Sequence, residues 1–303
     1  MTFKPLEVAD YKTLKNYFSE QPYNLSIYSL ASLIAWGNQM FRTSFMLRDG
    51  ICFIANEREK GGDSRHLILP VSGQRIFKPS ELHDYARDLG YRKYWFVPGD
   101  YLELFNRSEW SNFFTLEEQK EFEDYVYRTD DLIELKGNRY SKKRNLLSQF
   151  KRHYLFYDRV SVEPIRTDDV KECEHFLDIW CEQHACSEAE QASLACEKSA
   201  LITTLHHLSR LESMGILVRI DGVVSGLGIG SRLNETTVTL NFEKAFGEIK
   251  GLYQFLDNEC AKRLFGSFSL VNKESDMNLP HLAEAKQSYY PCHRVKSFEL
   301  GLQ

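Results

Sequence analysis

The sequence has no long apolar run. Its most apolar early stretch, Tyr23 to Trp36, is interrupted by an asparagine and three serines. A helix that spans a bilayer needs about 20 predominantly apolar residues. Residues 1–10 also have no secretory leader pattern. We therefore expect no membrane span and a cytoplasmic location.

The seven cysteines form no regular framework and include no Cys-x-x-Cys pair. An odd number of cysteines without a leader indicates free thiols in a reducing compartment. Four cysteines and two histidines gather within residues 173–196. Their spacing is wrong for a closed zinc site, so we predict no metal and expect the cysteines to pack as small apolar side chains.

No glycine-rich phosphate loop of the dinucleotide or P-loop type is present. The run Gly-Leu-Gly-Ile-Gly at 226–230 lies inside a predicted strand with no helix after it. Glycines there indicate either a bulge or a close approach of ligand to backbone. The net charge of −5 excludes a general polyanion binder. Any nucleic-acid contact would need a local basic patch.

A strand–helix–strand–helix segment is readable between residues 236 and 291. Alternating Thr and Val residues predict a strand from Thr236, and helical spacing of apolar residues predicts a helix over 251–265. A second strand at 267–272 and a helix at 279–289 follow. Polar residues close both strands, which predicts an α/β unit with a site at the carboxyl edge of its sheet.

The same element order occurs twice along the 303 residues. Each half reads as two helices, a Gly-turn hairpin, a strand, a helix, a strand and a helix, and Asp49-Gly50 and Asp221-Gly222 are the hairpin turns. We predict an α/β (α+β) chain of two tandem units with mixed sheets flanked by helices. The expected domains are 1–130 and 159–303, joined by a basic linker helix at 131–158.

The linker carries a marked change of charge. Residues 117–134 are rich in acids, with eight Asp and Glu, whereas 136–154 contain seven Lys and Arg and no acid. One interpretation is a solvated helix that pairs with the acidic run before it. The other is a phosphate- or nucleic-acid-binding surface that releases counterions. Its candidate residues are Arg139, Lys142, Lys143 and Arg144.

Acidic residues end two strands of the second half. Glu243 is placed to act as a general base toward an amine, or to form a salt bridge with Lys244 or Lys286. Glu274 and Asp276 end the next strand. In the last helix, Lys286 lies three residues before Tyr289, on the same side. Tyr289, or Tyr290 beside it, is the candidate acid, and Tyr253 is a further candidate for substrate binding.

Four motifs carry a resemblance to a known family, and the likeness covers nearly the whole chain. The motifs are Asp131–Asn145, Asn241–Ala245, Lys273–Asp276 and Ala285–Pro291. They resemble bacterial proteins related to the C-terminal domain of phosphatidylglycerol lysyltransferase. The resemblance implies two tandem domains of the acyl-CoA N-acyltransferase (GNAT-like) fold. That fold is shared with the Fem aminoacyltransferases, which take aminoacyl groups from tRNA.

The resemblance also implies site residues, matched by position. They are Gly137, Tyr140, Lys143, Arg144 and Asn145 in the linker, and Glu243, Lys244, Glu274, Asp276, Lys286, Tyr289 and Pro291 in the second domain. Lys273 stands where the family usually has Arg, and lysine cannot form the same bidentate clamp.

Together these observations favour an acyl- or aminoacyl-transferase that acts on a small-molecule or peptide amine. The donor would be aminoacyl-tRNA or acyl-CoA, lying near the start of the helix at Gly251, with no tightly bound cofactor. Backbone N–H groups of the central strand would hold the developing oxyanion. A missing Gln/Arg-x-x-Gly-x-Gly loop weighs against acyl-CoA. The alternative is a non-catalytic ligand- or tRNA-binding module on the same fold.

Overall fold

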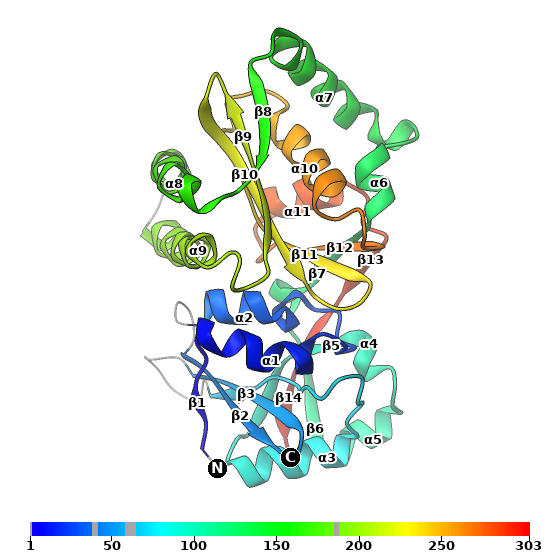
Figure 1. The fold of residues 1–303 in the computed structure, drawn as a ribbon. Coiled ribbons are helices and arrows are strands. Elements are labelled where there is room, and N and C mark those ends of the chain that lie inside the picture. Colours follow the sequence, from blue (N-terminus) through cyan, green and yellow to red (C-terminus); the bar gives the residue numbers. More distant parts are fainter. Residues whose placement is uncertain (1, 38–41, 58–64, 185–187) are drawn as a thin grey trace. The chain divides into compact units, whose positions relative to one another are not determined.

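Two seven-stranded sheets flanked by helices form the protein, as seen in a computed structural model that describes residues 2–37, 42–57, 65–184 and 188–303 (Figure 1). The strand orders are β1-β2-β3-β4-β5-β14-β6 and β13-β7-β12-β11-β10-β9-β8. The predicted mixed α/β class is confirmed. Most of a surface loop expected at residues 57–64 lies outside the described residues.

The chain divides into two compact units. Unit 1 comprises residues 1–126, 232–237 and 272–303, and unit 2 comprises residues 127–231 and 238–271. The duplicated element order is confirmed: strand, two helices, hairpin, strand, helix and strand occur as β1 to β5 and again as β8 to β12. The domain boundaries predicted at 130 and 158, and the tandem GNAT-like assignment, stay predictions.

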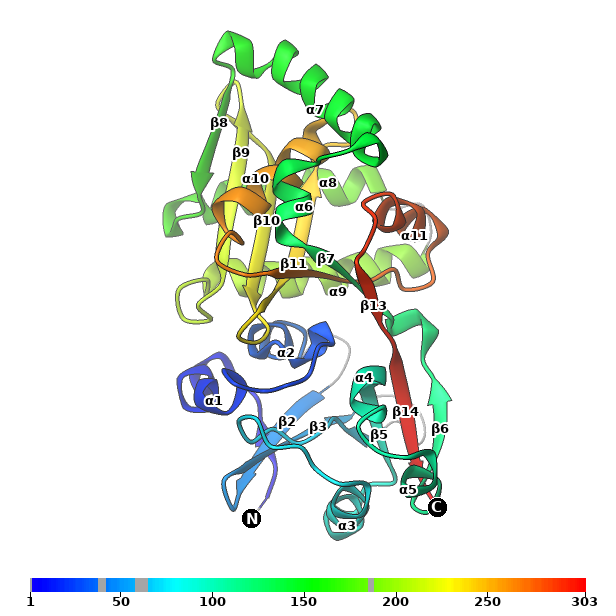
Figure 2. The same cartoon turned by 90° about the vertical axis from the view of Figure 1, so that its right-hand side faces the viewer.

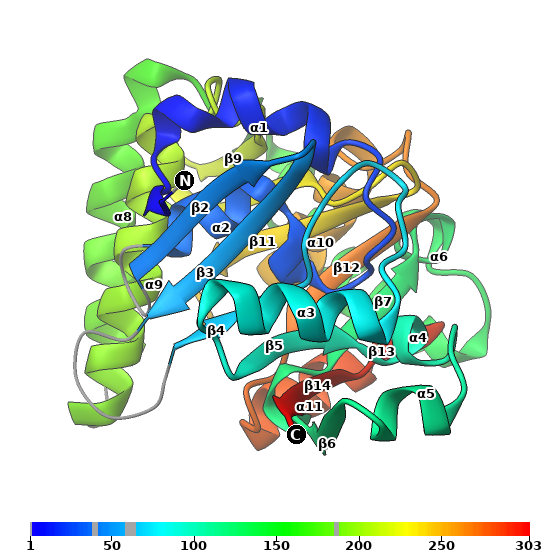
Figure 3. The same ribbon diagram turned by 90° about the horizontal axis from the view of Figure 1, so that it is seen from below.

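Unit 1 contains the first sheet. Its helices are α1 (Tyr11–Phe18), α2 (Leu30–Trp36), α3 (Pro79–Leu89), α4 (Gly99–Leu102), α5 (Arg107–Ser111) and α11 (Pro280–Gln287). Its strands are β1 (Lys4–Pro5), β2 (Arg42–Arg48), β3 (Ile51–Glu57), β4 (His66–Leu67), β5 (Lys93–Pro98), β6 (Phe114–Glu118), β13 (His293–Val295) and β14 (Ser297–Leu302). Helices α1 and α2 cover one face of the sheet and α3 the other (Figures 1 and 3). The C-terminal strand β14 runs antiparallel between β5 and β6 (Figure 2).

Local signals place these elements as predicted. Helix α3 begins at Pro79, and the carboxylate of Glu81 accepts the backbone N–H of Lys78 at 2.8 Å. It ends at Gly90, whose φ of 74° is the left-handed cap that glycine favours. The turn of the β2–β3 hairpin has positive φ at both Asp49 and Gly50, as a two-residue hairpin turn requires.

Strands β4 and β5 are parallel neighbours that pair only at Leu67 and Tyr94. Beyond that point the hydroxyl of Tyr28 bridges them: it accepts the N–H of Leu69 and donates to the carbonyl of Phe96, both at 3.1 Å. Tyr28 is fully buried. The side chain of Tyr28 therefore connects β4 and β5 where their backbones no longer pair.

Unit 2 contains helices on both faces of the second sheet. The helices are α6 (Thr129–Glu134), α7 (Ser141–His153), α8 (Val170–His184), α9 (Glu188–His206) and α10 (Leu252–Arg263). The strands are β8 (Val160–Pro164), β9 (Met214–Ile220) and β10 (Val223–Arg232), while β7 (Asp124–Arg128), β11 (Thr237–Ala245) and β12 (Leu270–Ser275) cross the boundaries of the units. Helices α8 and α9 cover one face, and α10 with α6 covers the other (Figures 1 and 2).

The glycine-rich run lies in β10 as expected. The β9–β10 register shifts between Val224 and Gly226, so the predicted bulge is confirmed. A side chain at Gly228 would collide with the sulfur of Cys260 on α10. The glycines thus let a helix approach the sheet closely.

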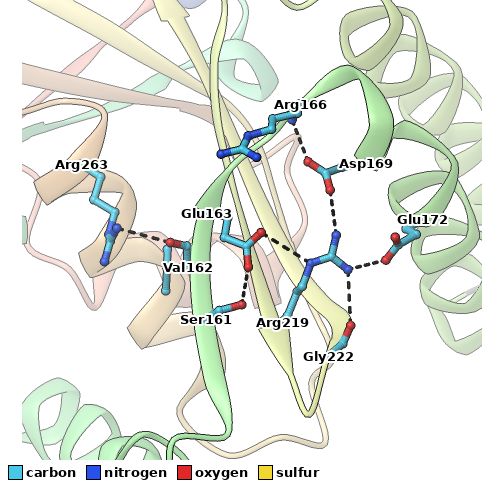
Figure 4. A network of polar contacts seen from close by, with 9 residues as sticks. All are labelled: Ser161, Val162, Glu163, Arg166, Asp169, Glu172, Arg219, Gly222 and Arg263. Atoms are coloured by element: carbon cyan, nitrogen blue, oxygen red, sulfur yellow. Dashed lines mark hydrogen bonds and ion pairs between the residues drawn. The ribbon is translucent and has the colours of Figure 1, made fainter.

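An ion network centred on Arg219 of β9 ties three elements of unit 2 together (Figure 4). The guanidinium lies 2.8 Å from Asp169 and 3.9 Å from Glu163, and it also pairs with Glu172. Asp169 lies just before α8, Glu163 lies in β8, and Glu172 lies in the first turn of α8. The network fixes the start of α8 against the β8–β9 pair.

The acidic run at residues 117–134 contains secondary structure that the sequence did not predict. Strands β6 and β7 and helix α6 occupy much of it. Asp124 is only 2% exposed, and its carboxylate accepts the backbone N–H of Ser26 at 2.6 Å and the amide of Asn272 at 2.8 Å. A buried, hydrogen-bonded aspartate cannot be told from a solvated one by charge pattern alone.

Candidate functional site

The end of β11 brings Lys244 into contact with both helices on one face of unit 2. Its ammonium lies 2.7 Å from a carboxylate oxygen of Glu197 on α9 and 4.1 Å from the ring centroid of Trp180 on α8. A cation above an indole face is attracted by the ring quadrupole. Lys244 is therefore held by the fold, and its charge is compensated by Glu197.

Trp180 and Tyr253 pack beside this lysine. The indole N–H of Trp180 lies 3.0 Å from the carbonyl of Ala245 and 3.2 Å from the hydroxyl of Tyr253. Burial raises the pKa of Tyr253, and the carboxylates of Glu243 and Glu197 add to the rise. Tyr253 is thus a neutral hydroxyl within electrostatic reach of Glu243.

A small cavity of about 10 Å³ lies on the α8–α9 side of Lys244. It is lined by Leu177, Trp180, Cys181, Glu197, Lys198, Leu201 and Lys244. This volume admits about one water molecule. Successive strand residues face opposite sides of a sheet, so half-buried Glu243 faces away from this closed side.

The end of β12, in unit 1, is held by Lys286 of α11. The ammonium donates to the carbonyls of Lys273, Glu274 (3.1 Å) and Ser275 (2.8 Å). Glu274 has a φ of 59°, a left-handed conformation that costs energy in a non-glycine residue. Desolvation lowers the pKa of Lys286, against the attraction of Glu274, Asp124 and Asp276. Lys286 therefore stabilises the backbone conformation at Glu274.

Asp276 is fixed by two donors. The hydroxyl of Tyr125 donates to its carboxylate at 2.6 Å, and the N–H of Asn278 does so at 2.9 Å. Burial, with help from Asp276, raises the pKa of Tyr125 to about 12. Asp276 is itself largely buried. Nearby, the Lys273 ammonium lies 4.6 Å from the ring centroid of Tyr289.

The predicted phosphate-binding residues lie just before α7 and in its first turn, and they fall into two groups. Arg144 donates to the carbonyls of Leu135 and Gly137 at 2.5 and 2.6 Å, and Arg139 pairs with Asp131 at 3.0 Å. Lys142 is exposed. The contacts of Arg139, and a pair between Lys136 and Glu134 at 2.7 Å, agree with a basic segment that pairs with the acidic run.

The structure brings the candidate residues together within each unit. Unit 2 gathers Glu243, Lys244 and Tyr253, and unit 1 gathers Glu274, Asp276, Lys286 and Tyr289. A single cleft shared by the two sets, and the catalytic roles of Glu243 and Tyr289, stay predictions. Sequence reasoning missed Trp180, because its indole N–H meets β11 only through tertiary packing. The aromatic residue on an expected helix was the only available signal.

Comparison with known proteins decides the family. A family model described as phosphatidylglycerol lysyltransferase, C-terminal, matches residues 23–299. The chain belongs to this family. The predicted resemblance is thereby confirmed.

Two solved bacterial proteins have a similar fold. A protein of unknown function from Bacteroides thetaiotaomicron is 24% identical over all of both chains, with a TM-score of 0.88. The C-terminal domain of a protein described as a lysylphosphatidylglycerol synthetase from Agrobacterium fabrum is 14% identical, with a TM-score of 0.65. That match covers 96% of this chain and 91% of the other. No curated protein is significantly similar in sequence. Among the described residues, no helix has the length and apolar character to cross a membrane.

Proposed function

We propose that the protein transfers an aminoacyl group from aminoacyl-tRNA to an amine, with Glu243 as general base. The observation that carries this proposal is the arrangement at the end of β11. Lys244 pairs with Glu197, and half-buried Glu243 lies within electrostatic reach of the neutral hydroxyl of Tyr253. A carboxylate in such a place can take a proton from an attacking amine.

The reaction balances without a further reactant. The amine nitrogen bonds to the carbonyl carbon of the aminoacyl ester, and the bond from that carbon to the ribose oxygen breaks. Glu243 takes the proton that the amine loses, and the ribose oxygen receives a proton as it leaves. Tyr289 as the acid that supplies that proton is a separate expectation, which Tyr289→Phe tests.

The start of α10 supports an RNA ester over an acyl-CoA thioester as donor. A side chain at Gly251 would collide with the carbonyl of Leu146, and Phe150 lies beside it, so α7 covers this helix start. The exposed Glu248 and Lys250 lie just before it and carry opposite charges, so this segment adds no net attraction for a pyrophosphate. The usual anion site at a helix N-terminus is therefore obstructed, whereas basic α7 offers a surface for RNA.

Transfer from charged tRNA tests the proposal directly. The full chain is incubated with tRNA pools charged with radiolabelled amino acids and with small amines or peptides as acceptors. Label that survives mild alkali has moved from an ester to an amide. Glu243→Gln should slow transfer by about 100-fold or more, and Glu248→Gln, on the exposed loop nearby, should not. Equal rates for the Glu243→Gln variant and wild type, or no transfer from any charged tRNA, would contradict the proposal.

A second candidate, a tRNA-binding module without catalysis, is favoured by the contacts of Lys286 and Lys273 inside unit 1. It predicts tRNA binding without loss of the aminoacyl ester. Lys142→Ala should then weaken binding and reduce its dependence on salt. Arg144 is unsuitable for this test, because it caps carbonyls at the end of α6.

A further inference from the structure

Four apolar side chains are exposed at one end of unit 2. Leu155, Phe156 and Tyr157, in the turn after α7, are 40%, 85% and 71% exposed, and Val223, the first residue of β10 after the β9–β10 turn, is 63% exposed. The end of α7, the start of β8 and the β9–β10 turn lie at the same end in Figures 1 and 2. The backbone N–H of Asp221 donates to the carbonyl of Arg159 at 2.8 Å, which joins the two turns. We call Leu155, Phe156, Tyr157 and Val223 the apolar tip.

We propose that the apolar tip and the last turn of α7 dock on the surface of an anionic lipid bilayer. The inference does not rest on the transferase activity. It combines two features that interfacial membrane segments share, which are exposed aromatic and aliphatic side chains and adjacent basic residues.

The residues that flank the apolar tip pack against the core of unit 2. Phe150 is fully buried and stacks on Phe255 of α10, with ring centroids 4.7 Å apart. Tyr154 stacks on Phe150 at 5.1 Å, and the guanidinium of Arg159 lies 5.0 Å from the Tyr154 ring. Arg159 in turn pairs with Asp221. The chain turns at Asp158, whose φ is 52°. The apolar side chains therefore point outward from a defined turn.

The charge beside the tip suits an anionic surface. Lys151, Arg152 and His153 form the last turn of α7, residues 135–157 contain no acid, and the exposed Asp158 that follows the tip is one acid against these basic residues. Within the described part of the chain, neither Lys151 nor Arg152 has a carboxylate partner. The nearby acid Asp221 is paired with Arg159. Basic residues next to an anionic leaflet are attracted by its negative surface potential.

A lipid surface fits the tip better than RNA does. RNA bases stack on aromatic rings, but Leu155 and Val223 have no ring to offer them. Apolar side chains of both kinds gain from removal from water in the acyl region of a bilayer. RNA binding by the tip is thus an alternative that the test must separate.

Vesicle cosedimentation of the full chain tests the docking. The probes are vesicles of mixed zwitterionic and anionic phospholipid, and vesicles of zwitterionic phospholipid alone. We expect binding to the anionic vesicles that weakens with salt. Phe156→Ser with Tyr157→Ser should reduce it about tenfold or more, and Lys151→Ser with Arg152→Ser should reduce both binding and its salt dependence.

Leu104→Ser is the matched control, because Leu104 is 56% exposed in unit 1. It should leave vesicle binding unchanged, and circular dichroism shows whether each variant is folded. Absence of binding to anionic vesicles, or equal binding by the variant changed at Phe156 and Tyr157, would overturn the proposal. A loss of tRNA affinity in that variant without a loss of vesicle binding would assign the tip to RNA instead.

Discussion

The hydroxyl of Tyr28 lies between β4 and β5 of unit 1, and Tyr253 lies on α10 of unit 2, close to the end of β11. The two hydroxyls have different partners. Tyr28 bonds to two backbone groups and closes the gap between β4 and β5. Tyr253 bonds to one backbone group, at Ala245, and to the indole of Trp180, and it lies within electrostatic reach of the Glu243 carboxylate. In unit 1 the polar groups at the strand ends hold the fold, whereas in unit 2 they remain beside a half-buried acid.

We therefore expect substitutions in the two units to affect stability and activity differently. Polar changes in the interior of unit 1 should lower stability, since they leave buried backbone groups without partners. Polar changes at the end of β11 should lower activity with a smaller loss of stability. The following variants test this contrast, in order of expected effect.

Lys286→Met should have the largest effect on stability. It removes a half-buried ammonium from three carbonyls and leaves buried Asp124 without the attraction of that charge. Leaving a buried carboxylate without this compensation costs about 3 kcal/mol, measured by urea unfolding. Lys296→Met is the control, because Lys296 is a half-exposed partner of Glu118. Equal midpoints for the two variants would refute the structural role of Lys286.

Tyr28→Phe should be the next most damaging change. It leaves the N–H of Leu69 and the carbonyl of Phe96 buried without the hydroxyl that bridges them, at a cost of about 2 kcal/mol. Tyr253→Phe is the matched change in unit 2, where Trp180 keeps its bond to Ala245. We expect the Tyr253→Phe variant to lose less stability and more activity than the Tyr28→Phe variant. The reverse ranking would remove the contrast between the units.

The sequence predicted the parts of the fold that local chemistry determines. The hairpin turns at Asp49-Gly50 and Asp221-Gly222 and the stop of α3 at Gly90 depend on neighbouring residues, and all three are confirmed. The roles that the family motifs imply for Glu243 and Lys286 stay predictions. The partners could not be predicted, because Glu197 and Trp180 meet Lys244 only after two helices pack on the sheet. For the same reason, the charge pattern does not reveal that Asp124 is buried.

Arg219→Lys should produce a smaller effect that depends on salt. The planar guanidinium contacts Asp169, Glu163 and Glu172 (Figure 4), and lysine cannot match this fork of donors. Two of these carboxylates are half-exposed, so the expected loss is about 1 kcal/mol or less. The loss should shrink at high salt, unlike that of Tyr28→Phe. A loss that stays constant with salt would show that packing, rather than charge, is responsible.

Asp124→Asn should change the pH dependence of stability in unit 1. Burial raises the pKa of Asp124 above its ordinary value of 3.8, against hydrogen bonds from Ser26 and Asn272 and the attraction of Lys286. The folded state therefore binds this proton more tightly than the unfolded state does. The carboxyl's contribution is fully present below its ordinary pKa and is lost as pH rises through the raised pKa.

Asparagine does not titrate, yet its amide oxygen can still accept from both donors. Urea unfolding across this acidic to neutral range should thus show the free energy of wild type falling relative to the Asp124→Asn variant as pH rises. Asp84→Asn, at an exposed position on α3, is the control and should leave the slope unchanged. Parallel curves for wild type and the Asp124→Asn variant would mean that Asp124 stays charged in the folded state. The hydrogen bonds and Lys286 would then outweigh burial, and the interior of unit 1 would hold an ion pair.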